Sequence, residues 1–183
     1  MSLINTTPDG FADGKYTLID AEFYEFSHSL LADTGTIAFG RNTFELFQNR
    51  WPPILEDKNA PEWSVRMAGA LNDKHKTVYS STLKTTTWNN STIIQKVDAK
   101  QVNSYKQHGK KGLLTFGSLS LVASLTEMKL IDDYYFCMQP LIAGNGAVRL
   151  FDKIKLDTGR PLKYVDSTQL KSGVHIIHYQ SVN

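Results

Sequence analysis

The sequence predicts an α/β fold with a mainly parallel central sheet, flanking helices and a C-terminal antiparallel β-hairpin. Short apolar runs that suit buried strands alternate with segments whose apolar residues recur at helical spacing. Near the C-terminus, two β-rich runs instead flank Lys171-Ser172-Gly173, a turn typical of hairpins. The alternation favours right-handed βαβ crossovers and parallel strands, and the hairpin places antiparallel strands at one edge of the sheet.

The 183 residues contain no repeat, low-complexity tract or Pro/Gly/Ser linker, which predicts a single domain over residues 1–183. A chain of this length buries about 70% of its unfolded surface and needs no disulfide or metal for stability. Cys137, the single cysteine, lies in an apolar run and is expected to be a buried thiol. The absence of a signal-peptide pattern and of a run of about 20 apolar residues predicts a cytoplasmic protein that does not enter membranes.

The charge balance argues against nucleic acid as the main partner. Lys and Arg total 20 and Asp and Glu total 18, a formal net charge of +2, so there is no broad cationic surface. No metal site is expected either. His175 and His178, three residues apart in a predicted strand, should point to opposite faces.

The elements of the N-terminal half follow from periodicity and from capping residues. A short strand runs into a turn at Pro8-Asp9-Gly10, and Asp20 is a candidate cap for the first helix. Gly35 is expected to end that helix. The expected strands are residues 2–7, 36–39 and 76–80, and the expected helices are residues 20–33, 43–48 and 62–71.

The C-terminal half follows the same logic. Gly109 is expected to close a polar helix, and Gly117-Ser118 is expected to open the next one. The expected helices are residues 99–108 and 118–125, and the expected strands are residues 92–95, 113–116, 133–139, 162–170 and 174–180.

The strand-to-helix turn at Gly40 is the first candidate binding site. Without a Cβ, Gly40 lets the backbone approach a ligand closely. The first N–H groups of the following helix lack internal partners and carry partial positive charge, so they favour an anion. Arg41 adds a forked cationic donor suited to phosphate, and Thr43 lies in the same turn. The alternative is a capped helix start with a surface arginine.

Two further segments have the composition of phosphate-binding turns. In Phe116-Gly117-Ser118-Leu119 a glycine again separates strand from helix, and Ser118 either caps the helix or bonds a phosphate oxygen. Ser80, Ser81 and Thr82 lie at the end of a strand and could bond a ribose 2′-phosphate. Alternatively, they form a turn in which a hydroxyl bonds its own backbone. Two anion-binding turns on one sheet suit a dinucleotide.

The ordered set of motifs resembles the C-terminal reductase domain of the bacterial bifunctional riboflavin deaminase-reductase, within the dihydrofolate-reductase-like family. The resemblance covers nearly the whole chain. Its motifs are Pro8-Asp9-Gly10-Phe11, Gly40-Arg41-x-Thr43-x-Glu45, Ser80-Ser81-Thr82-Leu83, Gly117-Ser118-x-x-Leu121, Leu130-Ile131-Asp132-Asp133-Tyr134, Pro140-Leu141-Ile142-Ala143-Gly144-Asn145-Gly146 and Leu150-Phe151.

The resemblance implies NADPH as cofactor, and it gives each motif a role. The residues expected to bind NADPH are Gly40, Arg41, Thr43, Ser80, Ser81, Phe116, Gly117, Ser118 and Leu119. The residues expected around the substrate are Asp9, Gly10, Phe11, Gly144 and Gly146. The remaining chemical role, donation of a proton, is given to Asp9 or to an ordered water.

The implied activity is reduction of 5-amino-6-(5-phosphoribosylamino)uracil in riboflavin biosynthesis, or of another small pyrimidine, pterin-like or carbonyl compound. The alternatives are a non-catalytic nucleotide-binding or scaffold protein and a dihydrofolate or pteridine reductase. Against a folate role, Asp20, Glu22 and Glu25 suit the exposed face of the first helix. The zinc deaminase is absent, because its ligands cannot be built from one cysteine.

A homodimer is also expected, partly from the resemblance. The C-terminal hairpin, with Val174, Ile176 and Tyr179 among its apolar residues, leaves a sheet edge that favours a partner. Trp51 and Trp63 flank a proline-rich loop, where packing is favoured over contact with a flat substrate.

Overall fold

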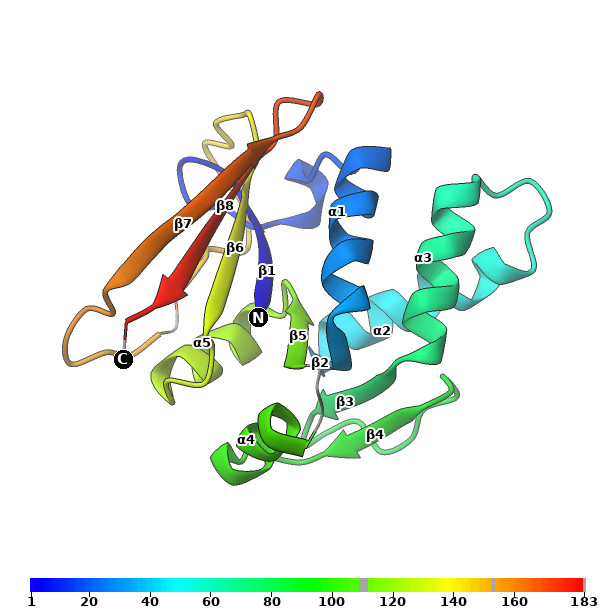
Figure 1. Cartoon of the computed structure of the whole chain (residues 1–183), viewed down its shortest axis with the longest axis horizontal. Helices are drawn as coiled ribbons and strands as arrows, with labels where there is room; N and C mark the ends of the chain where they lie inside the picture. Colours follow the sequence, from blue (N-terminus) through cyan, green and yellow to red (C-terminus); the bar gives the residue numbers. More distant parts are fainter. Residues whose placement is uncertain (109–111, 153, 183) are drawn as a thin grey trace. The chain divides into compact units, whose positions relative to one another are not determined.

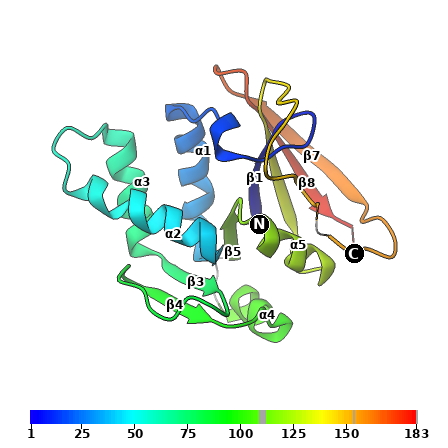
Figure 2. The same cartoon turned by 180° about the vertical axis from the view of Figure 1, so that it is seen from behind.

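The computed structural model describes residues 1–108, 112–152 and 154–182 (Figures 1 and 2). The chain divides into two compact units, one of residues Ala21–Ser118 and one built from Met1–Asp20 and Leu119–Asn183. We call them the central unit and the terminal unit. The expectation of a single domain over residues 1–183 stays a prediction.

The central unit contains four parallel strands in the order β4-β3-β2-β5. Their bounds are β2 Thr34–Gly40, β3 His75–Tyr79, β4 Ser91–Ile94 and β5 Gly112–Phe116. The side chains of Ile37, Phe39, Val78 and Leu114 are fully buried. Strands of parallel sheets are covered on both faces, which is why they appear in the sequence as short continuous apolar runs.

The helices of the central unit are α1 Ala21–Ala32, α2 Arg41–Arg50, α3 Glu62–Asp73 and α4 Ala99–His108, with a 3₁₀ turn η2 at Pro52–Leu55. Between α1 and α3, Tyr24 stacks on Trp63 with ring centroids 4.5 Å apart, and Glu25 forms an ion pair with Arg66. Trp51 is buried and meets Tyr24 edge-on. The packing role of both tryptophans is therefore confirmed.

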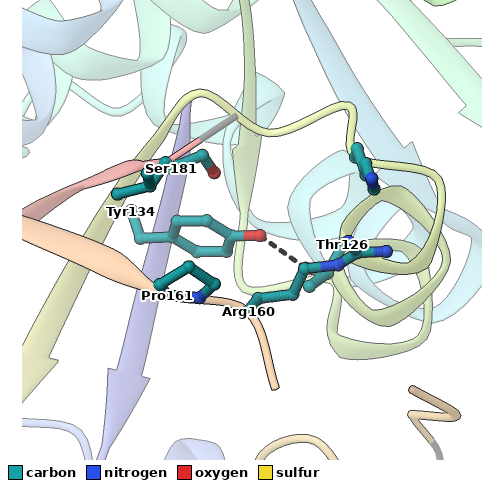
Figure 3. A pocket seen from close by; sticks show the side chains of 7 residues that line it. Thr126, Tyr134, Arg160, Pro161 and Ser181 are labelled. Atoms are coloured by element: carbon teal, nitrogen blue, oxygen red, sulfur yellow. Dashed lines mark hydrogen bonds between the residues drawn. The ribbon is translucent and has the colours of Figure 1, made fainter. Parts of the chain in front are cut away.

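The terminal unit combines parallel and antiparallel pairing. Its elements are β1 Ser2–Thr6, η1 Gly14–Tyr16, α5 Leu119–Glu127, β6 Asp133–Met138, β7 Leu162–Gln169 and β8 His175–Ser181. β1 pairs parallel to β6, while β8 pairs antiparallel to both β6 and β7. At the start of β6, the Tyr134 and Thr126 hydroxyls share a 2.8 Å hydrogen bond (Figure 3). Cys137 is buried as expected, and burial raises the pKa of its thiol.

Most predicted elements are present, with shifted ends. The prediction that Gly35 ends the first helix is wrong. Gly35 lies inside β2, where the pairing with β5 shifts register, and the Thr34 hydroxyl donates to the Leu30 carbonyl at 2.7 Å where α1 ends. α2 begins at Arg41, two residues earlier than expected, and α5 begins at Leu119, just after Ser118. Gly109 lies outside the described residues. None of the described helices is long and apolar enough to cross a membrane.

Candidate functional site

The first candidate site lies where β2 runs directly into α2. Gly40 is the N-cap of α2, and no side chain caps this helix with a hydrogen bond. Arg41 and Asn42 are exposed and Thr43 is half-buried. The N–H groups of the first helical turn have no intrahelical partner and carry the positive end of the helix dipole. The alternative of a side-chain-capped helix start is therefore not what the structure has, and such an uncapped turn is a type of site that favours anions.

The second predicted turn contacts the first one directly. The Gly40 N–H donates to the Ser118 Oγ at 2.6 Å, and both residues are buried. Gly117, between β5 and Ser118, has a φ of +51°, while an added Cβ would meet nothing within 4 Å. The backbone conformation therefore requires this glycine. Ser118 thus fixes the backbone at the point where β2 runs into α2.

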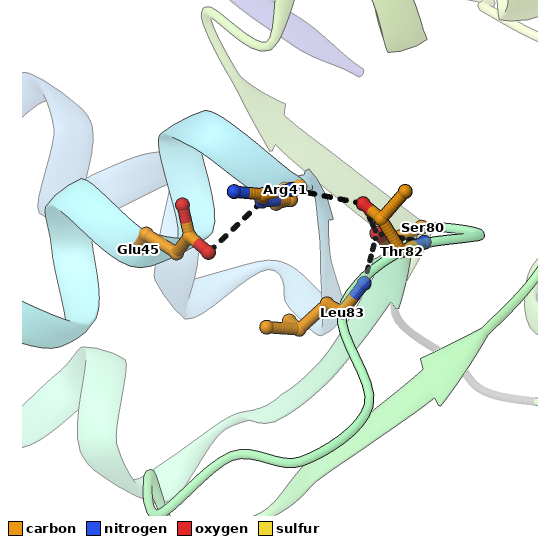
Figure 4. Close-up of polar contacts among 5 residues, drawn as sticks. All are labelled: Arg41, Glu45, Ser80, Thr82 and Leu83. Carbon is orange, nitrogen blue, oxygen red and sulfur yellow. Dashed lines mark hydrogen bonds and ion pairs between the residues drawn. The ribbon is translucent and has the colours of Figure 1, made fainter.

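Arg41 links the start of α2 to the segment after β3. Its Nη1 donates to Thr82 Oγ1 at 3.0 Å, and its Nε donates to Glu45 Oε1 at 3.0 Å (Figure 4). Arg41 is 48% exposed and Glu45 39% exposed, so water screens this ion pair and its main effect is to orient the guanidinium. A guanidinium has five N–H donors. Donors therefore remain for a phosphate beside Thr82.

The serine-rich segment after β3 forms the turn that was the alternative to phosphate binding. Ser80 Oγ accepts the N–H groups of Thr82 at 3.2 Å and Leu83 at 2.9 Å. Ser80 is buried by this arrangement, whereas Ser81 is exposed. Ser80 thus positions Thr82 so that its Oγ1 accepts the hydrogen bond from Arg41. Thr82 and Ser81 are the hydroxyls that an approaching ligand can reach.

Phe116 and Leu119, also expected to line the cofactor, lie on either side of Gly117-Ser118. Phe116 is buried, with its ring centroid 5.7 Å from that of Phe47 inside the central unit. Its side chain therefore belongs to the core. Leu119 begins α5 in the terminal unit. Within the central unit, hydrogen bonds join Gly40 to Ser118 and Arg41 to Thr82.

Asp9, in the terminal unit, holds the loop that contains Gly144. Its carboxylate accepts the Thr7 hydroxyl at 2.6 Å and the N–H groups of Ala143 at 3.1 Å and Gly144 at 2.8 Å. The bond from Thr7, followed by those from Gly144 and Ala143, lowers the pKa of Asp9 to about 2. An acid with this pKa carries no proton at neutral pH. The contacts of Asp9 therefore disfavour it as the proton donor.

Asp13, to which the sequence interpretation gave no role, binds loop N–H groups in the same way as Asp9. Its two carboxylate oxygens accept the N–H groups of Ala147 at 2.9 Å and Val148 at 3.1 Å, and the first of these bonds is the main cause of a lowered pKa. Gly146 lies so close that an added Cβ would be 2.5 Å from both the Asp13 carboxylate and the Phe11 ring. The partners are more than 130 residues apart in sequence, so no local pattern reveals them.

Two glycines in these loops have left-handed backbone conformations, with φ of +83° at Gly10 and +69° at Gly144. Phe11 is buried and covered by the Arg149 guanidinium, 4.4 Å from its ring centroid. The residues expected around a substrate thus form two loops that are joined by hydrogen bonds and packing. Their backbone donors at 143–144 and 147–148 are already occupied.

The chain belongs to the RibD C-terminal domain family, whose sequence pattern matches residues 9–176. It is 26% identical over 180 residues to the uncharacterized protein YyaP of Bacillus subtilis, covering 94% of this chain and 89% of that protein. The family assignment confirms the resemblance drawn from the motifs. It also supports a reductase-like role of the riboflavin-pathway type.

Solved structures with the same fold include a putative riboflavin biosynthesis protein from Shewanella sp. PV-4, with a TM-score of 0.69, 15% identity, and coverage of 100% of this chain and 98% of that one. Another is the deaminase/5-amino-6-(5-phosphoribosylamino)uracil reductase of Thermotoga maritima, with a TM-score of 0.65, 12% identity, and coverage of 99% of this chain and 56% of that one. At such low identities these likenesses concern the fold alone. They confirm the predicted dihydrofolate-reductase-like class.

Proposed function

We propose that this protein is an NADPH-dependent reductase that transfers a hydride to a small pyrimidine, pterin-like or carbonyl compound. The observation that carries the proposal is the uncapped first turn of α2, with Arg41 oriented beside it. Membership of the RibD C-terminal domain family supports NADPH as the ligand, since reductases of this family typically use it.

In this proposal two groups of residues in the central unit bind different phosphates of the cofactor. The N–H groups of the first α2 turn, together with Thr43, hold the pyrophosphate, and the bond from Ser118 keeps Gly40 in position for this. Arg41, Thr82 and Ser81 bind the 2′-phosphate that distinguishes NADPH from NADH. Bound NADPH would supply the hydride, and the protein supplies orientation and exclusion of water.

The Thermotoga protein is named as a reductase of 5-amino-6-(5-phosphoribosylamino)uracil, and we propose a substrate of the same chemical class for this chain. The Asp9–Gly144 loop pair would bind it, with Asp9 as an ionised positioning group rather than an acid. The proton would then come from an ordered water, the other donor that the sequence left open.

Tryptophan fluorescence can test the proposal, with the purified protein titrated with NADPH and with NADH. We expect saturable quenching by NADPH at micromolar to millimolar concentration and weaker binding of NADH. The absence of binding by either at millimolar concentration would overturn the proposal. If NADPH binds, loss of its 340 nm absorbance with ribosylaminopyrimidines, pterins and simple carbonyl compounds identifies the acceptor. Binding without turnover across that panel would favour the scaffold alternative.

We also propose that the protein is a homodimer, although two of the three residues first expected at the association edge are not available for it. Val174 and Ile176 are buried inside the terminal unit. The exposed apolar side chains belong instead to β7, where Tyr164 is 56% exposed and Val165 40% exposed, and whose described pairing is with β8 alone. Light scattering at micromolar concentration tests this, and a monomer mass would contradict it.

A further inference from the structure

A small cavity lies in the terminal unit at the start of β6 and the end of β8 (Figure 3). Its volume is about 50 Å³, whereas one water needs roughly 10–15 Å³. Two cationic side chains and three hydroxyls line it, and the lining includes no carboxylate. These polar residues are Lys129, Arg160, Thr126, Tyr134 and Ser181.

Arg160 supplies a buried donor that has no acceptor. Its Nη2 donates to the Glu127 carbonyl at 3.3 Å, which anchors the guanidinium at the C-terminal end of α5. Its Nε is buried without a hydrogen-bond partner in the described part of the chain. A buried donor without an acceptor is destabilising. A simple helix-capping role explains the bond from Nη2 but leaves Nε without an acceptor.

Lys129 stands in a backbone position that suits glycine. Its φ is +59°, and the bonds from Lys129 N to Thr126 O at 3.1 Å and from Leu130 N to Leu125 O at 2.8 Å end α5 in a Schellman-type turn. This conformation is unfavourable for a non-glycine residue. The turn places Lys129 among the residues that line the cavity. Neither Lys129 nor Arg160 is paired with a carboxylate among the described residues.

The three hydroxyls of the lining are already engaged with protein groups. Thr126 and Tyr134 share a hydrogen bond, Tyr134 also bonds Ser181, and Ser181 donates to the Ile131 carbonyl. The lining therefore offers an anion two cationic side chains, one of which carries the unpartnered Nε–H of Arg160.

We propose that this cavity binds phosphate, either as the free ion or as the phosphate group of a small ester. The site is distinct from the Asp9 loop within the same unit. The loop follows the opposite end of β6, and the five steps from Asp133 to Met138 separate the two ends by about 16 Å. Phosphate is favoured over a carboxylate because two cations face the cavity and a phosphate carries up to two negative charges.

The test uses an Arg41→Ala background, so that the cofactor site of the central unit does not compete for phosphate. With ¹³C-labelled tyrosine, inorganic phosphate is titrated at constant ionic strength while the ring signal of Tyr134 is followed, assigned by Tyr134→Phe. We expect a saturable shift, and at least tenfold weaker binding when Lys129→Asn is added. Asparagine tolerates the left-handed conformation, so this variant keeps the turn. Lys58→Asn, in an exposed loop of the central unit, is the charge-matched control and should change nothing.

Two further titrations distinguish the sources of the anion. Tighter binding of glycerol phosphate than of inorganic phosphate at the same residues identifies an ester as the ligand, and the reverse identifies the free ion. Equal binding of acetate would overturn the assignment to phosphate. A shift that does not saturate, or that Lys129→Asn and Lys58→Asn alter equally, would show only general ion screening and would overturn the site.

Discussion

The first turn of α2 and the loop of residues 143–148 both present consecutive backbone N–H groups, but those groups have different partners. At the start of α2 no side chain caps the helix, and an arginine stands beside the exposed turn. In the loop, Asp9 binds the N–H groups of Ala143 and Gly144, and Asp13 binds those of Ala147 and Val148. The two segments therefore differ in whether side chains of the protein already accept their N–H groups.

In the proposed function, this difference distinguishes the segment that binds phosphate from the segment that has a structural role. Donors without protein acceptors favour an anionic ligand, which is why the phosphates are placed on the central unit. The loop N–H groups already donate to the carboxylates of Asp9 and Asp13, so they cannot bind a phosphate without breaking these hydrogen bonds. The two carboxylates also repel an anion. The loop pair of the terminal unit is therefore better suited to shape a pocket than to hold phosphate.

Arg41→Ala should produce the largest effect. Loss of a charged hydrogen bond costs about 1.5–3 kcal/mol, so the Kd for NADPH should rise by about 10- to 150-fold, while the free energy of unfolding stays nearly constant. Calorimetric titration with NADPH measures the Kd. Arg66→Ala, which removes an exposed arginine paired with Glu25 in the same unit, is the control. Equal affinity of Arg41→Ala and the wild type would remove Arg41 from the phosphate site.

Ser118→Ala should lower both stability and NADPH affinity, because the buried Gly40 N–H loses its acceptor. We expect a loss of about 1–3 kcal/mol in the free energy of unfolding, measured by urea denaturation. Ser120→Ala, at an exposed position of α5, should be close to neutral. A neutral Ser118→Ala would show that this bond does not fix the turn.

Gly146→Ala tests the packing of the loop of residues 143–148 against Asp13 and Phe11. The new Cβ would meet Asp13 and Phe11 at 2.5 Å, and such overpacking costs about 1–3 kcal/mol. The loss should appear in thermal unfolding without a large change in affinity for the adenosine phosphates. Gly159→Ala is the matched control, since an added Cβ there meets nothing within 4 Å. Equal stability of the two variants would contradict the tight packing of the loops.

The pH dependence of Asp9→Asn should be the smallest effect. The folded-state pKa of Asp9 is about 2, below its ordinary value of 3.8, so its contribution to stability is present above pH 4 and is lost as the pH falls from about 4 to 2. Wild-type unfolding should therefore be steeper than that of Asp9→Asn across this range. Urea denaturation at pH 7, 4 and 3 measures the slopes. Parallel curves would show that Asp9 is not held by Thr7 and the loop.

The alternation of strands and helices was predictable because burial on both faces and helical periodicity leave local patterns. Arg41 and Glu45 are four residues apart, so their pairing also follows from the sequence. Gly35 misled the interpretation because a glycine suits both a helix end and an irregularity within a strand. The register shift beside it depends on β5, far along the chain.

The hydrogen bonds between segments far apart in the sequence could not be predicted for a similar reason. That Gly40 and Ser118 share one sheet edge follows from parallel pairing of β2 and β5, but the bond between them depends on the backbone geometry at Gly117. Asp9 and Asp13 meet loop amides more than 130 residues away. Nothing near either aspartate distinguishes an acceptor of backbone N–H groups from an acid that donates a proton.

The most direct test of the central claim is an amide NMR titration with adenosine 2′,5′-bisphosphate, which carries phosphates but no nicotinamide. The open first turn of α2 predicts large, saturable shifts for the N–H groups of Arg41, Asn42 and Thr43, and small ones for Ala143, Gly144, Ala147 and Val148. Shifts centred on the loop of residues 143–148, with the α2 amides unchanged, would contradict the assignment of the phosphate site to the central unit.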